Sequence, residues 1–114
     1  MPTTEINASV FEELKQMSGA EFINELIDTF LDDSPKLLNE LKTALQANNP
    51  ETFRRAAHSL KSNSATFGAG HLSDLAKELE MMGKENKLSE VGNRIATLQE
   101  TYNKVASELK GLRQ

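Results

Sequence analysis

The sequence contains no cysteine and no tryptophan, and it has few aromatic residues (5%), prolines (3) and glycines (6). Without cysteine, a disulfide framework, a thiol nucleophile and a cysteine metal site are all excluded. The shortage of aromatic residues and turn formers disfavours a β-sandwich and favours helices. No apolar run approaches the roughly 18 residues that a membrane span needs, so no membrane partner is expected.

The charge balance is mildly acidic. Thirteen basic and seventeen acidic residues give a net charge of −4, and nucleic-acid binding usually needs a basic face, so no nucleic-acid partner is expected. A length of 114 residues predicts one domain over 1–114. The sequence does not begin with a basic segment followed by an apolar run, so no signal peptide and a cytoplasmic location are expected.

Apolar residues recur at the spacing of amphipathic helices, separated by short turns. A short helix is predicted over 10–16, and the pairs Ser9/Glu12 and Ser18/Glu21 fit capping boxes. A second helix carries an apolar face from Phe22 to Leu31. The run 32–35, Asp-Asp-Ser-Pro, predicts that this helix ends and that a new one begins there, with capping as the role of the two aspartates.

Three further helices are predicted in the second half of the chain. Asn49-Pro50 is typical of a helix start, and the glycines at 68 and 70 interrupt the helix that follows. The next helix is predicted to stop at Gly83. The last segment, 88–112, repeats apolar residues at alternating steps of three and four.

Several amphipathic helices joined by short turns predict an all-α fold, an antiparallel up-and-down four-helix bundle with additional short N-terminal helices. In such a bundle each helix buries one apolar stripe, and the protein is expected to be a monomer. The alternative is a homodimeric coiled coil formed through the seam from Leu88 to Leu112.

His58 falls opposite the apolar face of the predicted helix over 53–67, so its ring is expected to face solvent. Arg54 lies one turn before it, Lys61 lies about one turn after it, and small residues surround it. Near neutral pH an imidazole nitrogen can attack phosphorus, and nearby cations can stabilise phosphoryl oxygens. Glu80, on the next helix, could hold the other ring nitrogen if the two helices are antiparallel. The alternative is an ordinary solvated surface histidine.

Other signals in the sequence are weaker. The pair Gly68-x-Gly70 lacks a third glycine and a preceding strand, so no dinucleotide loop is expected, and no ATP site is visible. His58 and His71 have no second ligand at helical spacing, so no metal site is expected. His71 is expected to be an ordinary surface or packing residue. No resident cofactor is predicted.

The stretch 57–69, AHSLKSNSATFGA, resembles the signature of histidine-containing phosphotransfer (HPt) domains, and the stretch 72–80, LSDLAKELE, resembles the next helix of that family. The resemblance covers nearly the whole chain and implies a helical bundle with an N-terminal helical cover. It implies that His58 is the phosphoacceptor, that Lys61 stabilises the phosphoryl group and that Glu80 orients the imidazole. Gly68 matches a position kept small for docking. Ser62 departs from the family, in which glycine often follows the lysine.

By this resemblance the chain is a phosphorelay intermediate of two-component signalling. His58 would accept a phosphoryl group from a receiver-domain phosphoaspartate and pass it to another receiver. The expected partners are response-regulator receiver domains or a hybrid histidine kinase, with Mg²⁺ on the receiver. The chain itself is expected to be a carrier and not an enzyme. The alternative is a docking module that accepts no phosphate. The predicted docking strip around His58 comprises Arg54, Ser62, Ala65, Gly68 and Ala69.

Overall fold

The computed structural model describes residues 5–113, so most of the segment in which a signal peptide was sought lies outside the described residues. Five α-helices and one 3-10 helix, η1, follow one another along the chain. Their bounds are α1 Ala8–Ser18, α2 Ala20–Gln46, α3 Pro50–Thr66, α4 Gly70–Lys84, η1 Leu88–Glu90 and α5 Arg94–Leu112. Between residues 5 and 113 there is no strand.

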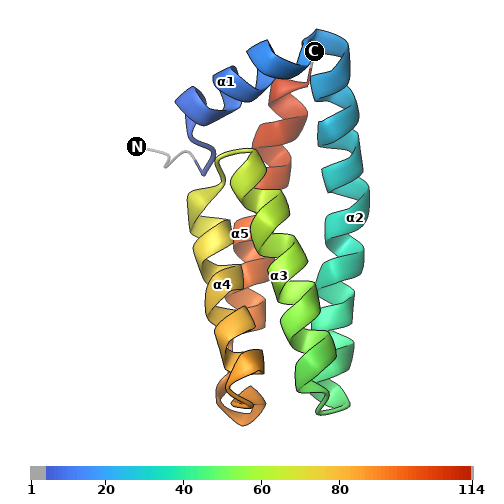
Figure 1. The fold of residues 1–114 in the computed structure, drawn as a ribbon, viewed down its shortest axis with the longest axis vertical. Coiled ribbons are helices and arrows are strands. Elements are labelled where there is room, and N and C mark those ends of the chain that lie inside the picture. The colour runs from blue at the N-terminus through green and yellow to red at the C-terminus, as the bar shows by residue number, and fades with distance from the viewer. Residues whose placement is uncertain (1–4, 114) are drawn as a thin grey trace.

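The long helices α2 to α5 run alternately down and up the molecule, and α1 lies across the end of the bundle that also holds the C-terminus (Figure 1). The molecule is elongated, 42 × 30 × 18 Å. Each long helix turns one apolar stripe inward. The ring of Phe30 in α2 lies 5.3 Å from that of Phe67, the C-cap of α3, and 5.8 Å from that of Tyr102 in α5. The predicted all-α antiparallel bundle is confirmed, with one short N-terminal helix where more than one was expected.

The predicted break at 32–35 is wrong, because α2 continues through Pro35 to Gln46. Proline has no N–H to donate to the carbonyl of Leu31, yet the buried residues Phe30, Ser34 and Leu38 keep the spacing of one helix face across it. Burial of this continuous face outweighs the local cost of the proline. The aspartates at 32 and 33 therefore lie inside a helix and cap nothing.

The ends of α3 agree with the sequence. Asn49 is the N-cap, its side chain accepts a hydrogen bond from the Thr52 N–H at 3.2 Å, and Pro50 occupies the first turn. The helix ends at Thr66, and Gly68 turns the chain with a φ of 75°. Both the predicted start and the predicted interruption are confirmed.

The N-caps of the first two helices differ from the prediction. Asn7, and not Ser9, caps α1 through hydrogen bonds to the N–H groups of Ser9 and Val10. The Asn7 N–H donates to the Gly68 carbonyl at 2.9 Å, and the Glu108 carboxylate accepts from the N–H of Glu5 at 2.8 Å. The N-cap of α2 is Gly19, which has no side chain to cap with, so the predicted capping box at Ser18 is also wrong.

The last segment is not one continuous helix. Leu88 lies in η1, Gly92 adopts a φ of 55°, and α5 begins only at Arg94. The seam residues Leu98, Val105 and Leu109 are fully buried within the single chain. They are therefore already packed in the bundle and cannot form the proposed coiled coil without unpacking it. A monomeric state stays a prediction.

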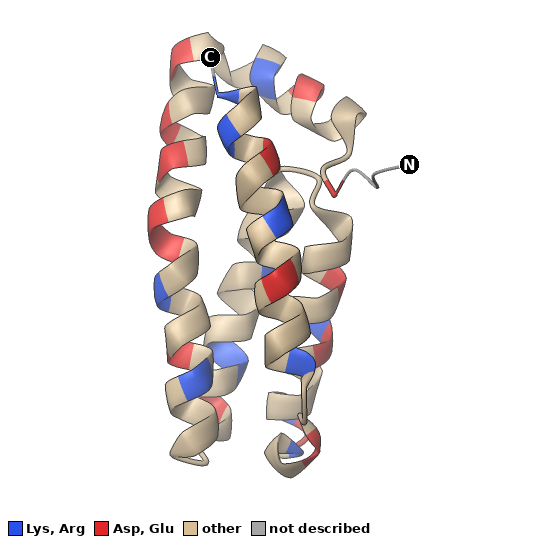
Figure 2. Ribbon diagram, turned by 180° about the vertical axis from the view of Figure 1, so that it is seen from behind, with Lys and Arg blue, Asp and Glu red and all other residues tan. Residues whose placement is uncertain are grey.

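Charged residues are distributed unevenly along the bundle. In the view from behind, the upper half of α2 carries successive acidic bands, while basic and acidic bands alternate along α5 (Figure 2).

Within the described part of the chain, no helix is long and apolar enough to cross a membrane.

Candidate functional site

His58 occupies the middle of α3 and points away from the core. Phe53, Ala57 and Leu60 of the same helix are fully buried, while 55% of the His58 side chain is exposed. The helical periodicity of α3 therefore places the ring in solvent, and the prediction that His58 faces outward is confirmed.

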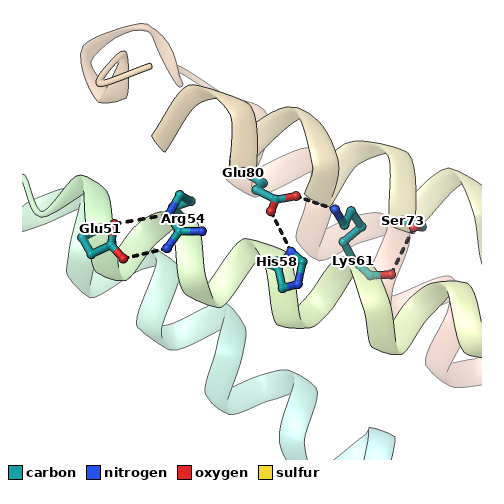
Figure 3. A network of polar contacts seen from close by, with 6 residues as sticks. All are labelled: Glu51, Arg54, His58, Lys61, Ser73 and Glu80. Carbon is teal, nitrogen blue, oxygen red and sulfur yellow. Dashed lines mark hydrogen bonds and ion pairs between the residues drawn. The ribbon is translucent and has the colours of Figure 1, made fainter. Parts of the chain in front are cut away.

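Glu80 of α4 joins His58 to Lys61 (Figure 3). Its Oε2 lies 2.7 Å from the Nδ1 of His58, and its Oε1 accepts a hydrogen bond of 2.7 Å from the Lys61 Nζ. Only 14% of the Glu80 side chain is exposed. The antiparallel packing of α3 and α4 thus brings together the three residues that the sequence singled out for the chemistry.

Electrostatics fix the proton on the ring. The hydrogen bond from the Lys61 ammonium lowers the pKa of Glu80 below its ordinary value; burial opposes this and the His58 hydrogen bond adds to it. Glu80 is therefore an ionised acceptor at neutral pH, and the Nδ1 of a neutral His58 must carry the hydrogen. The lone pair of Nε2 is left free to act as a nucleophile.

The surroundings of His58 are less positive than the sequence suggested. The Arg54 guanidinium binds the Glu51 carboxylate through its Nη2 at 2.7 Å and its Nε at 3.2 Å. Lys61 is paired with Glu80. Both predicted cations are thus partly neutralised. The spacing of Glu51 and Arg54, three residues apart on one helix, was the available signal for the first pair.

The backbone of α3 at Lys61 is also tied to α4. The Ser73 hydroxyl donates a hydrogen bond to the Lys61 carbonyl at 3.1 Å. This contact and the Glu80 carboxylate hold α4 against the same turn of α3 (Figure 3).

The predicted docking strip is only partly exposed. Ser62 and Ala65 are exposed, and Arg54 and Gly68 are half-buried. Ala69 is fully buried in the core, so its place in an exposed strip is wrong. Residue 69 lies at the turn between α3 and α4, where the chain folds back inward.

The small size of Gly68 serves the fold. A Cβ at this position would lie 2.8 Å from the Cβ of Val10 in α1, and the φ of 75° disfavours any L side chain. The close neighbour that excludes a larger residue is therefore α1 of the same chain.

The sequence reasoning missed the contribution of α2 to the site. A groove of about 470 Å³ runs beside His58 between α2 and α3. Its α2 wall is formed by Asp33, Lys36, Leu37 and Glu40, and its α3 wall includes Ser59, Ser62 and Asn63. The prediction of a break at Pro35 prevented this assignment. Only when the helix is continuous across residue 35 do positions 33, 36, 37 and 40 lie on one side of it.

The second histidine belongs to a different contact. The Nδ1 of His71 lies 3.1 Å from the Oε1 of Glu5 in the N-terminal segment. In the range 5–113, no three histidine, aspartate or glutamate side chains gather as they would around a metal ion.

Known proteins resemble this chain both in sequence and in the arrangement of their helices. The family model of the Hpt domain matches residues 25–108. The phosphorelay protein LuxU of Vibrio harveyi is 32% identical over 93 residues, which are 81% of each chain. The crystal structure of histidine-containing phosphotransfer protein B (HptB) from Pseudomonas aeruginosa PAO1 superposes with a TM-score of 0.91 at 30% identity, covering 99% of this chain and 97% of that one.

A more distant structure shares the fold. The HPT domain of a sensor hybrid histidine kinase from Shewanella superposes with a TM-score of 0.79 at 22% identity, covering 96% of this chain and 93% of that one. The Hpt match includes α3 and α4, the helices that carry His58, Lys61 and Glu80. This chain belongs to the Hpt domain family.

Proposed function

We propose that this protein is a phosphorelay intermediate of two-component signalling, in which His58 carries the phosphoryl group. The proposal depends on one observation. The His58 Nδ1 lies 2.7 Å from Glu80, while 55% of the His58 side chain is exposed. One nitrogen is fixed as a donor, so the other is available to a second protein. Family membership and the similarity to LuxU support this function.

The transfer step uses the Nε2 lone pair of a neutral His58. It attacks the phosphorus of a receiver phosphoaspartate in line, so the P–N bond forms as the P–O bond to the aspartyl carboxylate breaks. The carboxylate leaves with the bonding electron pair. The ring keeps its proton on Nδ1 and becomes cationic, and the ionised Glu80 stabilises that charge. Reversing the step onto a second receiver aspartate returns the ring to neutrality.

Lys61 is proposed to stabilise the phosphoryl oxygens. In the unphosphorylated protein its Nζ is bound to Glu80, and an ammonium group has three donors. It can therefore keep one hydrogen bond to Glu80 while offering another to a phosphoryl group on the neighbouring ring. Glu80 thus serves both as the orienter of the imidazole and as the holder of the lysine.

The docking surface for the receiver is proposed to be the groove between α2 and α3 together with the exposed Ser62 and Ala65. Ser59 and Ser62 are small and flank His58, so a partner's carboxylate can approach the ring closely. Phe22 lies in the first turn of α2, and 50% of its surface is exposed, so it can add an apolar contact near the N-terminus of that helix. Gly68 supports this surface indirectly, because its small size lets α1 pack closely against the turn after α3.

We propose that the partners are receiver domains, either of response regulators or of a hybrid kinase, and that the receiver supplies Mg²⁺ for the transfer. The protein acts as a carrier with no ATP chemistry of its own, as a cytoplasmic monomer, and residues 1–114 form one domain.

The experiment that tests this function is labelling by a phosphorylated receiver. The wild-type protein should acquire a label that acid removes and base does not, and His58→Gln should abolish it. His71→Gln is the matched control because it removes the other histidine and should label normally. Binding of the receiver without any labelling of the wild type would favour the docking module instead, and equal labelling of His58→Gln would refute the site.

A further inference from the structure

Gly83 marks a point where α3 and α4 approach unusually closely. It is a buried residue of α4, and a Cβ built on it would lie 3.0 Å from the backbone N of Arg54, 3.1 Å from its Cα and 3.1 Å from its Cβ. Two of these three atoms belong to the backbone and cannot rotate away. Any side chain at position 83 therefore requires the two helices to move apart locally.

The conformation of Gly83 gives no other reason for glycine. Unlike Gly19, Gly68 and Gly92, it does not have a positive φ, and α4 continues beyond it to Lys84. The helix thus ends one residue after the stop predicted at Gly83, and its C-cap is Glu85 and not the glycine. Glycine weakens a helix relative to alanine, and the close contact with α3 gives a reason for it at this position. By contrast, a Cβ on Gly111 of α5 would meet nothing within 4 Å.

This contact lies next to the His58 site. Arg54 precedes His58 by four residues on α3, and Gly83 follows Glu80 by three residues on α4, so each pair of positions is one turn apart. The helices are antiparallel (Figure 1), and Arg54 therefore faces Gly83 one turn away from the point where His58 faces Glu80.

We propose that Gly83 is a positioning residue, which sets the separation of α3 and α4 at which Glu80 reaches both His58 and Lys61. The proposal deepens the function proposed above, because it concerns the proton position on the phosphate-accepting ring. Glu80 has little freedom to compensate, since both of its oxygens are bonded at 2.7 Å and its side chain is largely buried. Moving α4 away by a few tenths of an ångström lengthens or breaks one of these hydrogen bonds.

The consequence is chemical. When the bond to Glu80 weakens, a neutral His58 is free to carry its hydrogen on Nε2, and that form has no lone pair on Nε2 with which to attack phosphorus. A substitution at a buried position of α4, one helical turn from Glu80, is thus expected to lower the fraction of rings that carry the lone pair on Nε2.

The test is Gly83→Ala, with Gly111→Ala as the matched control. In ¹⁵N-labelled protein at about pH 8, where an ordinary imidazole is neutral, long-range ¹H–¹⁵N spectra report which nitrogen of His58 is protonated. The wild type and Gly111→Ala should show protonated Nδ1. Gly83→Ala should keep its helical circular dichroism but shift the ratio toward protonated Nε2 by roughly fivefold. Phosphorylation of its Nε2 by phosphoramidate, a donor that needs no docking protein, should slow in parallel.

Two results would overturn the proposal. The first is an unchanged His58 tautomer in Gly83→Ala, which would mean that the close contact serves stability alone. The second is loss of the fold in Gly83→Ala, which would likewise assign Gly83 to stability and not to the position of Glu80. The tautomer is measured without any phosphoryl donor, so this outcome is independent of the proposed relay. Failure of the wild type to accept phosphate would instead refute the proposed function and leave the tautomer result intact.

Discussion

Replacing Glu80 separates its two proposed contributions, the position of the ring proton and the stabilisation of the ring cation. Glu80→Gln keeps an amide oxygen that can accept from the Nδ1–H but removes the negative charge. Glu80→Ala removes both. We expect phosphotransfer from a receiver to be slower in Glu80→Gln and slower still in Glu80→Ala.

The magnitude follows from the geometry. Opposite unit charges ~4 Å apart attract by ~4 kcal/mol at the effective dielectric of a protein surface. The His58 side chain is 55% exposed, and screening by solvent reduces the attraction to ~1–2 kcal/mol, close to the advantage of a charge-assisted hydrogen bond. Because ~1.4 kcal/mol is a tenfold change in rate, Glu80→Gln should slow transfer by roughly 5- to 30-fold.

The assay is rapid-quench transfer of labelled phosphate at saturating receiver, so that docking does not limit the rate. The matched control is Glu78→Gln, because Glu78 lies on the same helix but pairs with Arg94 and does not touch His58. It should transfer at the wild-type rate. If Glu80→Ala transferred as fast as the wild type, the reasoning about the ring proton and the ring cation would be refuted together.

Three further predictions concern stability. The pKa of Glu80 is lowered in the folded protein, so its contribution to stability is present above its ordinary value of 4.5 and is lost as the pH falls through the lower folded value. The difference in denaturation midpoint between the wild type and Glu80→Gln should therefore shrink as the pH falls below 4.5. Gly68→Ala should lower the free energy of unfolding by about 2–4 kcal/mol, because the new side chain combines a positive φ with overlap on Val10. Its control is Gly70→Ala, which has open space around it and should change the free energy of unfolding in urea by no more than about 0.5 kcal/mol. Ser34→Ala should leave stability unchanged or raise it by up to about 1 kcal/mol, since among the described residues the buried Ser34 hydroxyl has no hydrogen-bond partner; a loss above this size in thermal unfolding would contradict that account.

The exposure of His58 could be predicted because it depends only on the 3.6-residue repeat of one helix. Phe53, Ala57 and Leu60 define the buried side of α3, and every other position on that helix then follows by rotation. The start of α3 at Asn49-Pro50 was predictable for the same reason, because capping depends on neighbouring residues alone.

The errors arose where tertiary packing overrode a local signal. Pro35 and the aspartates before it are typical of a helix start, but the buried face that includes Ser34 and Leu38 continues across them. Gly83 lies one residue before the end of α4, as its type suggests, but its small size also admits the close approach of Arg54, which no local signal indicated. Each local preference is worth a few kcal/mol at most, and burial of a continuous apolar face can exceed it.

The sharing of Glu80 between His58 and Lys61 could not be predicted from spacing, because it depends on the separation and register of two helices. The sequence placed a carboxylate near the ring only on condition that the helices are antiparallel. It gave no sign that Lys61 would be bound to the same carboxylate, with each hydrogen bond 2.7 Å long. For this reason Lys61 contributes less net positive charge beside His58 than its position in the sequence suggests.

The charges of this cluster explain why a carrier of this design needs its partner. With a neutral ring, Lys61 and Glu80 cancel, and phosphorylation adds about −1.5 to −2 on the phosphoryl group against the +1 of the ring. One lysine that bridges Glu80 and the phosphoryl group can hold this modest excess in the resting phosphoprotein. During transfer, the receiver's own carboxylates approach the same phosphoryl group, and Lys61 cannot offset that added charge. We infer that the missing positive charge enters with the receiver, so that transfer is fast only when the two proteins are docked.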